Sequence, residues 1–229
     1  MRRMLTTLVL VLVGAAAPLR AGNLDLRVGA FFPRADSGAA NDIFRDNSEL
    51  FTVSESDWTN AIGGVQYNVG LGRLVEVGLS LDYYSRENYT SYRDFTRDDD
   101  TEITQTLRYE LMPLGLTVRL IPTSRSAKIA PFVGIGGDVV FWEYEEWGDF
   151  IDFGFGGPRP PVEYDSFLSE GAEIGFHVTG GLKVAINEDF AVVGEARYLW
   201  AEGDMGEDFY QNRIDLSGLS VTLGFNIRF

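Results

Sequence analysis

Residues 219–229, LSVTLGFNIRF, decide the fold class. Apolar side chains occupy every odd position from Leu219 to Phe229, and polar or very small residues occupy the even positions between them. Successive side chains of a β-strand point to opposite faces of its sheet. The segment therefore predicts a strand with one apolar face and one polar or small face.

The same two-residue period recurs in seven earlier segments. In residues 75–83, Val75 and Leu79 alternate with Glu76 and Ser80, as a half-polar strand requires. The other six segments lie at 24–32, 61–69, 107–120, 133–141, 174–184 and 192–200. We therefore expect eight strands.

The composition of the two faces indicates which of them faces the interior. The polar face is dominated by Gly, Ser and Thr with a few charges of both signs, whereas a water-facing surface would be rich in Lys and Glu. Small residues fit a narrow interior, and large apolar residues fit contact with lipid. Closure is what allows a sheet to sit in lipid. We predict an all-β fold, an eight-stranded antiparallel up-and-down transmembrane β-barrel. A soluble lipocalin-like barrel is the alternative.

The connections support the membrane barrel. Short turns at 70–73, 122–127 and 187–189 alternate with long segments at 34–57, 85–102, 145–166 and 201–213. Outer-membrane barrels have short turns on the periplasmic side and long loops outside. Aromatic residues gather where strands meet the long segments, as in an aromatic girdle: Trp58, Tyr83, Tyr84, Trp142, Tyr144 and Trp200.

Two local features modify this pattern. In residues 107–120 the apolar face changes parity, from Leu107 and Leu111 to Leu116 and Leu120, which predicts a bulge at Met112–Pro113. In the first long segment a short helix is expected, with an apolar stripe and an N-cap: Ile43, Phe44, Leu50 and Phe51, capped by Asn41.

The first 21 residues have the form of an export signal. Arg2 and Arg3 precede an apolar stretch at 5–17, and Ala21–Gly22 is a plausible cleavage point. We predict a cleavable secretory signal peptide at 1–21 and a barrel domain at 22–229. A buried first helix is the alternative. No later stretch reaches 18 uncharged apolar residues, so no transmembrane helix is expected.

Composition excludes several classes of protein. The 229 residues carry a formal net charge of −15, which argues against binding to nucleic acid. The chain has no Cys, which excludes a disulfide framework and thiolate metal sites.

Three stretches resemble a known superfamily. PFVGIGGDVVFWEY (131–144), GEARYLW (194–200) and the terminal run resemble the small outer-membrane barrels of the OmpA, OmpX and OmpW type. The resemblance covers roughly the whole mature chain and implies a bacterial outer-membrane location after export. It also implies that Phe225, Ile227 and Phe229 form the signal read by the barrel-assembly machinery. The fold hosts anchors, adhesins, small channels and lipid enzymes, so the resemblance fixes no activity.

The charged residues on the polar faces are the candidate site. Eight strands enclose a space that side chains just fill, so charges there have to pair. We predict a polar network in the barrel interior, acting as a structural plug or as a gate that opens when pairs exchange. Its proposed members are Arg108, Glu110, Glu195 and Arg197, with Glu76, Asp138, Glu173, Lys183 and Arg228 as further candidates.

The sequence also contains candidate residues for catalysis and for metal binding. His177, Thr179 and Glu195 compose a hydroxyl–imidazole–carboxylate set, and a family of lipid A deacylases resembles it. Thr stands where that family has Ser, however, and His177 is expected to point into the lumen. The acidic outer loops contain carboxylates for Ca²⁺ or Mg²⁺ but lack the spacing of a calcium loop, so solvated loops are the default. We predict no enzyme, cofactor or metal.

The function expected from the sequence is that of a non-enzymatic integral outer-membrane protein, with a structural or loop-mediated interaction role. The alternatives are a narrow channel or lateral transporter for small hydrophobic molecules or ions, and a lipid A-modifying enzyme. Expected partners are outer-membrane lipid, lipopolysaccharide and the barrel-assembly machinery, with no nucleic acid, and the protein is expected to be a monomer.

Overall fold

The computed structural model describes residues 22–35, 42–124, 127–152, 154, 160–207, 209 and 212–229. The predicted signal peptide and the proposed cap Asn41 lie outside the described residues. The elements are β1 (Gly22–Pro33), α2 (Ile43–Leu50), η1 (Glu55–Trp58), β2 (Asn60–Leu71), β3 (Val75–Thr96), β4 (Glu102–Leu120), β5 (Ile129–Ile151), β6 (Val162–Ala185), β7 (Phe190–Trp200), β8 (Glu202–Asp204), β9 (Arg213–Asp215) and β10 (Gly218–Arg228).

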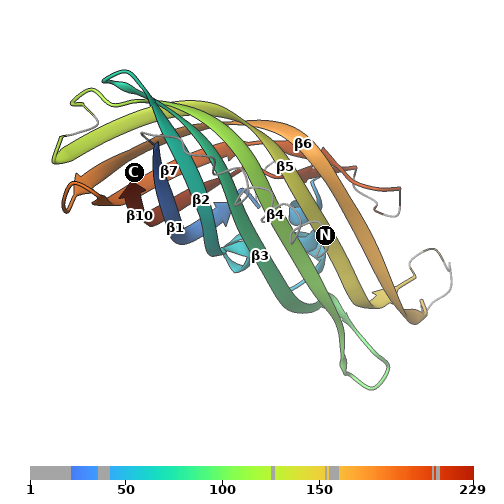
Figure 1. Cartoon of the computed structure of the whole chain (residues 1–229). Helices are drawn as coiled ribbons and strands as arrows, with labels where there is room; N and C mark the ends of the chain where they lie inside the picture. Colours follow the sequence, from blue (N-terminus) through green and yellow to red (C-terminus); the bar gives the residue numbers. More distant parts are fainter. Residues whose placement is uncertain are drawn as a thin grey trace.

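Eight antiparallel strands form a closed barrel, in the order β1-β10-β7-β6-β5-β4-β3-β2 (Figure 1). The ladder between β1 and β10 closes it and runs from Asn23↔Arg228 to Pro33↔Gly218. The predicted fold class is therefore confirmed. In the described part of the chain, no helix is long and apolar enough to cross a membrane.

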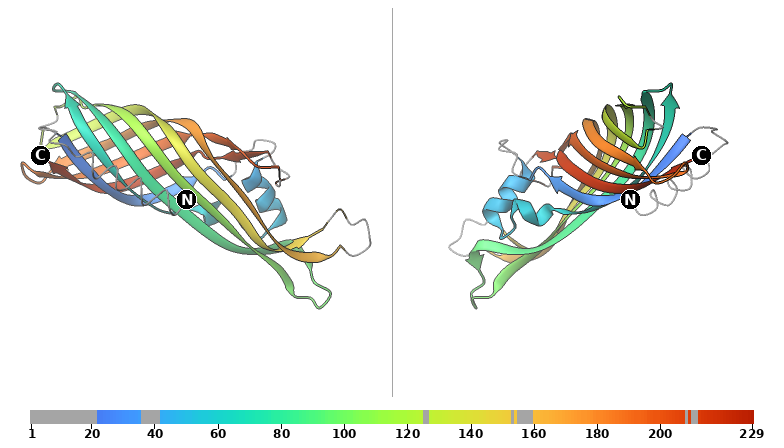
Figure 2. Two further views of the ribbon diagram at one scale, coloured as in Figure 1. Left: turned by 45° about the vertical axis from the view of Figure 1, so that its right-hand side comes forward. Right: turned by 90° about the vertical axis from the view of Figure 1, so that its left-hand side faces the viewer.

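The barrel is much taller on one side than on the other. β1, β2, β7 and β10 have 11 or 12 residues, whereas β3 to β6 have 19 to 24. The four long strands project past the barrel at the end opposite the C-terminus (Figure 2). This end is called the loop end below, and the other the turn end. The predicted loops at 85–102 and 145–166 were wrong, because β3 continues to Thr96, β4 begins at Glu102, and β5 and β6 continue to Ile151 and from Val162.

The predicted bulge at Met112–Pro113 is also wrong. The register between β4 and β5 is unbroken from Gln105↔Gly148 to Leu120↔Val133, so β4 keeps one parity throughout. The apolar side chains change face because the barrel interior changes character along its axis. Leu107 and Leu111 are buried in an apolar interior at the loop end, whereas Leu116 and Leu120 are exposed on the outer surface at the turn end.

Residues 42–58 of the first loop pack against the interior of the barrel at the loop end. A short helix is confirmed, but its N-cap is Asp42, whose side chain accepts a hydrogen bond from the Phe44 amide (3.1 Å). The ring centroid of Phe44 lies 5.0, 5.2 and 6.1 Å from those of Trp58, Tyr109 and Tyr144. These are edge-to-face contacts, a geometry that aromatic pairs prefer. α2 thereby closes an aromatic core within the loop half of the barrel.

Loops contact both edges of the tall sheet, where β3 and β6 extend past their shorter neighbours. On the β3 edge, Thr52 N donates to Ser91 O (2.9 Å), and the guanidinium of Arg93 donates to the carbonyl of Phe51 (2.8 Å). On the β6 edge, Gly206 N donates to Ser169 Oγ (3.0 Å). These contacts restrict the unpaired strand edges available to another chain.

Candidate functional site in the barrel interior

The centre of the polar interior is a carboxylate shared by three arginines. Glu195 on β7 pairs with Arg27 of β1 (2.9 Å), with Arg119 of β4 and with Arg197 of its own strand (3.3 Å). All four side chains are at most 7% exposed. Taking such charges out of water is costly unless each is paired, and Glu195 supplies a common partner.

Two further acceptors complete the shell around the guanidinium groups. Asp82 of β3 accepts from Arg27 through both oxygens (2.7 and 2.8 Å) and from Arg197 (3.3 Å). Gln66 Oε1 of β2 accepts from Arg27, Arg119 and Arg197, at 2.8, 2.9 and 3.1 Å. The network thus ties together β1, β2, β3, β4 and β7.

The network continues towards the turn end. Arg119 also reaches Asp25 (3.3 Å), and its guanidinium carbon lies 4.5 Å from the centroid of the Phe132 ring. Asn226 Nδ2 donates to Asp25 (2.5 Å). Lys183 pairs with Glu76 at 3.6 Å. These contacts occupy the interior of the turn half with charged and amide side chains.

Glycines on the inward face make room for these side chains. A Cβ at Gly64 would lie 2.0 Å from Asp82 Oδ1, one at Gly78 would lie 2.3 Å from Gln66 Nε2, and one at Gly136 would lie 2.4 Å from His177 Cε1. The network therefore occupies the space that these glycines, which have no side chain, leave free.

A hydroxyl–imidazole–carboxylate chain does occur, with different members from those predicted. His177 Nε2 lies 2.9 Å from Thr117 Oγ1, and His177 Nδ1 lies 2.5 Å from Asp138 Oδ2. Thr179 instead donates to the carbonyl of Ala196 (3.2 Å). His177 and Asp138 are at most 1% exposed, and the cavity that Asp138 helps to line has a volume of about 20 Å³. Such a cavity holds about one water molecule.

The four predicted network residues divide into two pairs. Glu195 and Arg197 lie in the network, but Arg108 and Glu110 lie on the outer face of β4 and were wrongly assigned to the interior. Arg108 pairs there with Glu145 and Glu143 (3.5 Å). It faces outwards because Leu107, Tyr109 and Leu111 occupy the inward positions of that part of the strand.

Several network residues were not singled out from the sequence: Arg27, Gln66, Asp82 and Arg119. The available signal was their parity, since each alternates with outward apolar residues of a predicted strand.

Of the further candidates, Glu76, Asp138 and Lys183 are buried, and Glu173 and Arg228 are half-buried. Of the proposed assembly signal, Phe225 and Phe229 are exposed, and that role stays a prediction.

A second polar cluster lies in the core at the loop end. The Tyr144 hydroxyl donates to Glu146 Oε1 (2.6 Å), and Asn47 Nδ2 of α2 donates to the same oxygen (3.2 Å). Glu146 lies beyond Phe141 of the same strand, on the part of β5 that projects from the barrel. Burial raises the pKa of Glu146, although the two hydrogen bonds act in the opposite direction. In the described chain, no group of His, Asp and Glu side chains is arranged to hold a metal ion.

Comparison with known proteins identifies the class. The family model of the outer membrane protein beta-barrel domain matches residues 6–229, and the chain belongs to this family. The protein is therefore a β-barrel of the bacterial outer membrane. Because such barrels carry their long loops outside, we expect the loop end to face the exterior. No curated protein matches the chain at a significant level.

Solved structures show the same fold at low identity. The chain is similar to the outer membrane protein OprG from Pseudomonas aeruginosa (12% identity, 92% of this chain and 97% of that chain, TM-score 0.53). It is also similar to a major outer membrane protein from Thermus thermophilus (10% identity, 92% and 100%, TM-score 0.50). These likenesses concern the fold alone.

We predict that Glu195→Gln lowers the free energy of unfolding by roughly 3–5 kcal/mol, because three buried arginines lose their shared carboxylate. Arg108→Ala should lower it by less than about 1 kcal/mol, since its ion pairs are solvent-accessible. Urea unfolding in detergent, followed by tryptophan fluorescence, measures both. Glu188→Gln, at an exposed turn, is the control. An equal loss in the Glu195 and Arg108 variants would contradict the assignment of these two residues to opposite faces.

The contribution of Glu146 to stability depends on pH. Folding raises the pKa of Glu146 above its unfolded value of 4.5, so the folded state holds this proton more tightly than the unfolded state does. As the pH rises from the unfolded pKa to the folded pKa, the carboxyl group ionises and the fold loses stability. Glu146→Gln should therefore be more stable than the native chain at pH 7 and lose that advantage below about pH 4. Unfolding free energies at pH 4 and pH 7 provide the measurement. A variant that is less stable than the native chain at pH 7 would show that the ionised Glu146 is net stabilising.

Proposed function

We propose that this protein is a plugged, non-enzymatic outer-membrane barrel that anchors a rigid sheet and its loops at the exterior surface. The observation that carries this proposal is the continuous filling of the interior. A charged network fills the turn half and an aromatic core fills the loop half. Nothing in the described interior resembles a path for a solute.

The polar half supports a plug rather than a gate. Opening it would separate Glu195 from Arg27 and Arg119, whose side chains are at most 2% exposed. Breaking a buried pair so that one charge loses its partner costs roughly 3–5 kcal/mol. Because Gln66 and Asp82 contact the same arginines, several pairs would have to separate together.

The loop half supports the same conclusion. Phe44 packs among Trp58, Tyr109 and Tyr144, and α2 is also held by the hydrogen bond from Asn47 to Tyr144 (2.5 Å). A cavity of about 20 Å³ is lined both by charged residues of the polar half, such as Asp82 and Arg197, and by apolar residues, such as Phe31 and Leu111. This volume suits one water molecule and no larger solute.

The burial of His177 supports a non-enzymatic role. Its chain with Thr117 and Asp138 has the spacing of an activated hydroxyl. However, a lipid substrate would have to reach a hydroxyl that is enclosed within the charged network. The arrangement is better suited to satisfying a buried carboxylate than to acyl transfer.

We predict no stepwise ion current from the full chain in a planar bilayer, at pH 7 and in molar potassium chloride. Arg197→Ala, which removes one cation from the network, should also fail to conduct. Insertion is verified in parallel by heat-modifiable gel mobility of the recovered protein. Discrete, reproducible current steps from the native barrel would overturn the plug and favour the channel alternative.

A further inference from the structure

We infer that the outward face of the projecting β3–β6 sheet is a docking site for an extended, cationic polypeptide segment. This inference rests on the proposed function, in which the sheet and loops at the exterior make the functional contacts. It specifies which surface makes the contact and what kind of partner binds there. The register of the four strands, the exposed side chains on this face and their charge support the docking site.

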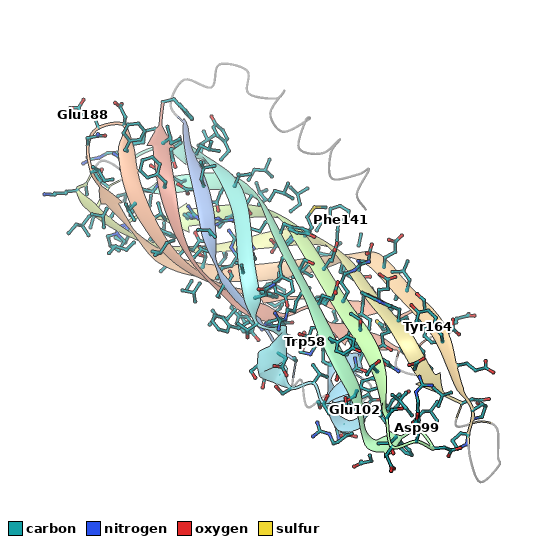
Figure 3. The ribbon with its side chains drawn as sticks, turned by 90° about the horizontal axis from the view of Figure 1, so that it is seen from below. Trp58, Asp99, Glu102, Phe141, Tyr164 and Glu188 are labelled. Carbon is teal, nitrogen blue, oxygen red and sulfur yellow. The ribbon has the colours of Figure 1, made fainter. Side chains whose placement is uncertain are left out.

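Cross-strand pairing arranges the outward side chains in rows. The lipid-facing wall includes the apolar row Leu81, Leu114, Val139 and Ile174 and, two residues further along their strands, Tyr83, Phe141 and Ala172. The next row changes abruptly to Ser85, Glu110, Glu143 and Glu170. Phe141 and Tyr164 are labelled in Figure 3, and Tyr164 lies nearer the loop end. The acidic row therefore marks where this wall leaves the hydrocarbon.

Large apolar side chains are exposed beyond that boundary. Tyr89 is 76% exposed, Tyr164 is 72% and Leu168 is 50%. Tyr89 and Trp147 flank Thr106 in one cross-strand row, so their rings border a position occupied by a short side chain. These side chains offer apolar contacts to a partner on both edges of one rigid sheet. The opposite face of this sheet is packed against the aromatic core, which holds the surface in shape.

The charge of the face selects the partner. The acidic row contains three carboxylates, and the next row, in which Glu87 and Glu145 flank Arg108, contains two more. Arg108 is the one cation against these five carboxylates in the two rows. Like charges directly opposite each other destabilise a sheet. Glu143 faces Glu110 on one side and Glu170 on the other, so a bound cationic chain would relieve this repulsion.

Arg108 shows how a cationic side chain fits this surface. Its guanidinium carbon lies 5.4 Å from the centroid of the Trp147 ring, and the group pairs with Glu145 and with Glu143 (3.5 Å). Aromatic faces and carboxylates together favour guanidinium and ammonium groups. An extended segment that runs parallel to the strands, with Arg or Lys at alternate positions, would place its cations over successive rows, because both repeat every two residues. An anionic partner would be repelled by the same carboxylates and by the net charge of −15.

The test uses the full chain in nanodiscs of zwitterionic lipid and a fluorescent octapeptide of alternating Arg and Thr. Anisotropy should show saturable binding that weakens as salt is raised. The triple variant Glu110→Gln, Glu143→Gln, Glu170→Gln should bind about tenfold more weakly, and Tyr89→Ala several-fold more weakly. The matched control, Glu55→Gln, Glu188→Gln, Glu202→Gln, removes the same charge from exposed positions elsewhere and should change binding less than about twofold.

Several outcomes would overturn the inference. They are equal weakening by the two triple variants, no saturable binding, complete displacement of the peptide by millimolar Mg²⁺, and preferential binding of a neutral oligosaccharide. Loss of the acidic row relieves repulsion, so the triple variant should fold at least as well as the native barrel, which heat-modifiable mobility verifies. Conductance measured on the same preparation separates the two proposals. A barrel that conducts no ions and does not bind the peptide contradicts only the docking site, whereas a barrel that conducts ions contradicts the plug.

Discussion

Closure of the barrel between β1 and β10 is the constraint on which the rest of the structure depends. Lipid offers no hydrogen bonds, so each backbone group in the membrane has to be paired within the sheet, and a closed ring of strands achieves this. The continuous ladder from Asn23↔Arg228 to Pro33↔Gly218 joins the first strand to the last. At eight strands the enclosed space is only as wide as the side chains that fill it. Charges on inward positions are therefore forced into contact with each other.

The interior answers this constraint in two different ways. In the turn half, inward glycines leave room for Arg27, Arg119 and Arg197 to converge on Glu195. In the loop half, where β3 to β6 extend past the shorter strands, the inward positions carry aromatic and aliphatic residues and the outward positions carry charges. The polarity of the wall is thus inverted along the barrel axis, while the strands continue without a break.

Strand number, antiparallel order and closure were predictable because a two-residue period survives along each strand. The loop boundaries were not predictable in the same way. Residues 85–96 and 145–151 carry polar side chains on their outward face, and a segment without an apolar outward face was interpreted as a loop. The same assumption produced the bulge at Met112–Pro113 and placed Arg108 and Glu110 inside. Glu195 and Arg197 were predictable from one strand alone. Their partner Arg119 lies 76 residues from Glu195, and only the closed barrel brings them together.

The filled interior is tested most directly by thiol accessibility, since the chain has no native Cys. Ser80→Cys and Ser220→Cys place thiols on buried inward positions of β3 and β10, and Asp99→Cys places one at the exposed tip between β3 and β4 (Figure 3). A water-soluble maleimide should label the folded Asp99 variant promptly and label the two interior variants only after unfolding. Labelling of the folded Ser80 variant at the rate of the Asp99 variant would reveal a water-filled lumen and contradict the account.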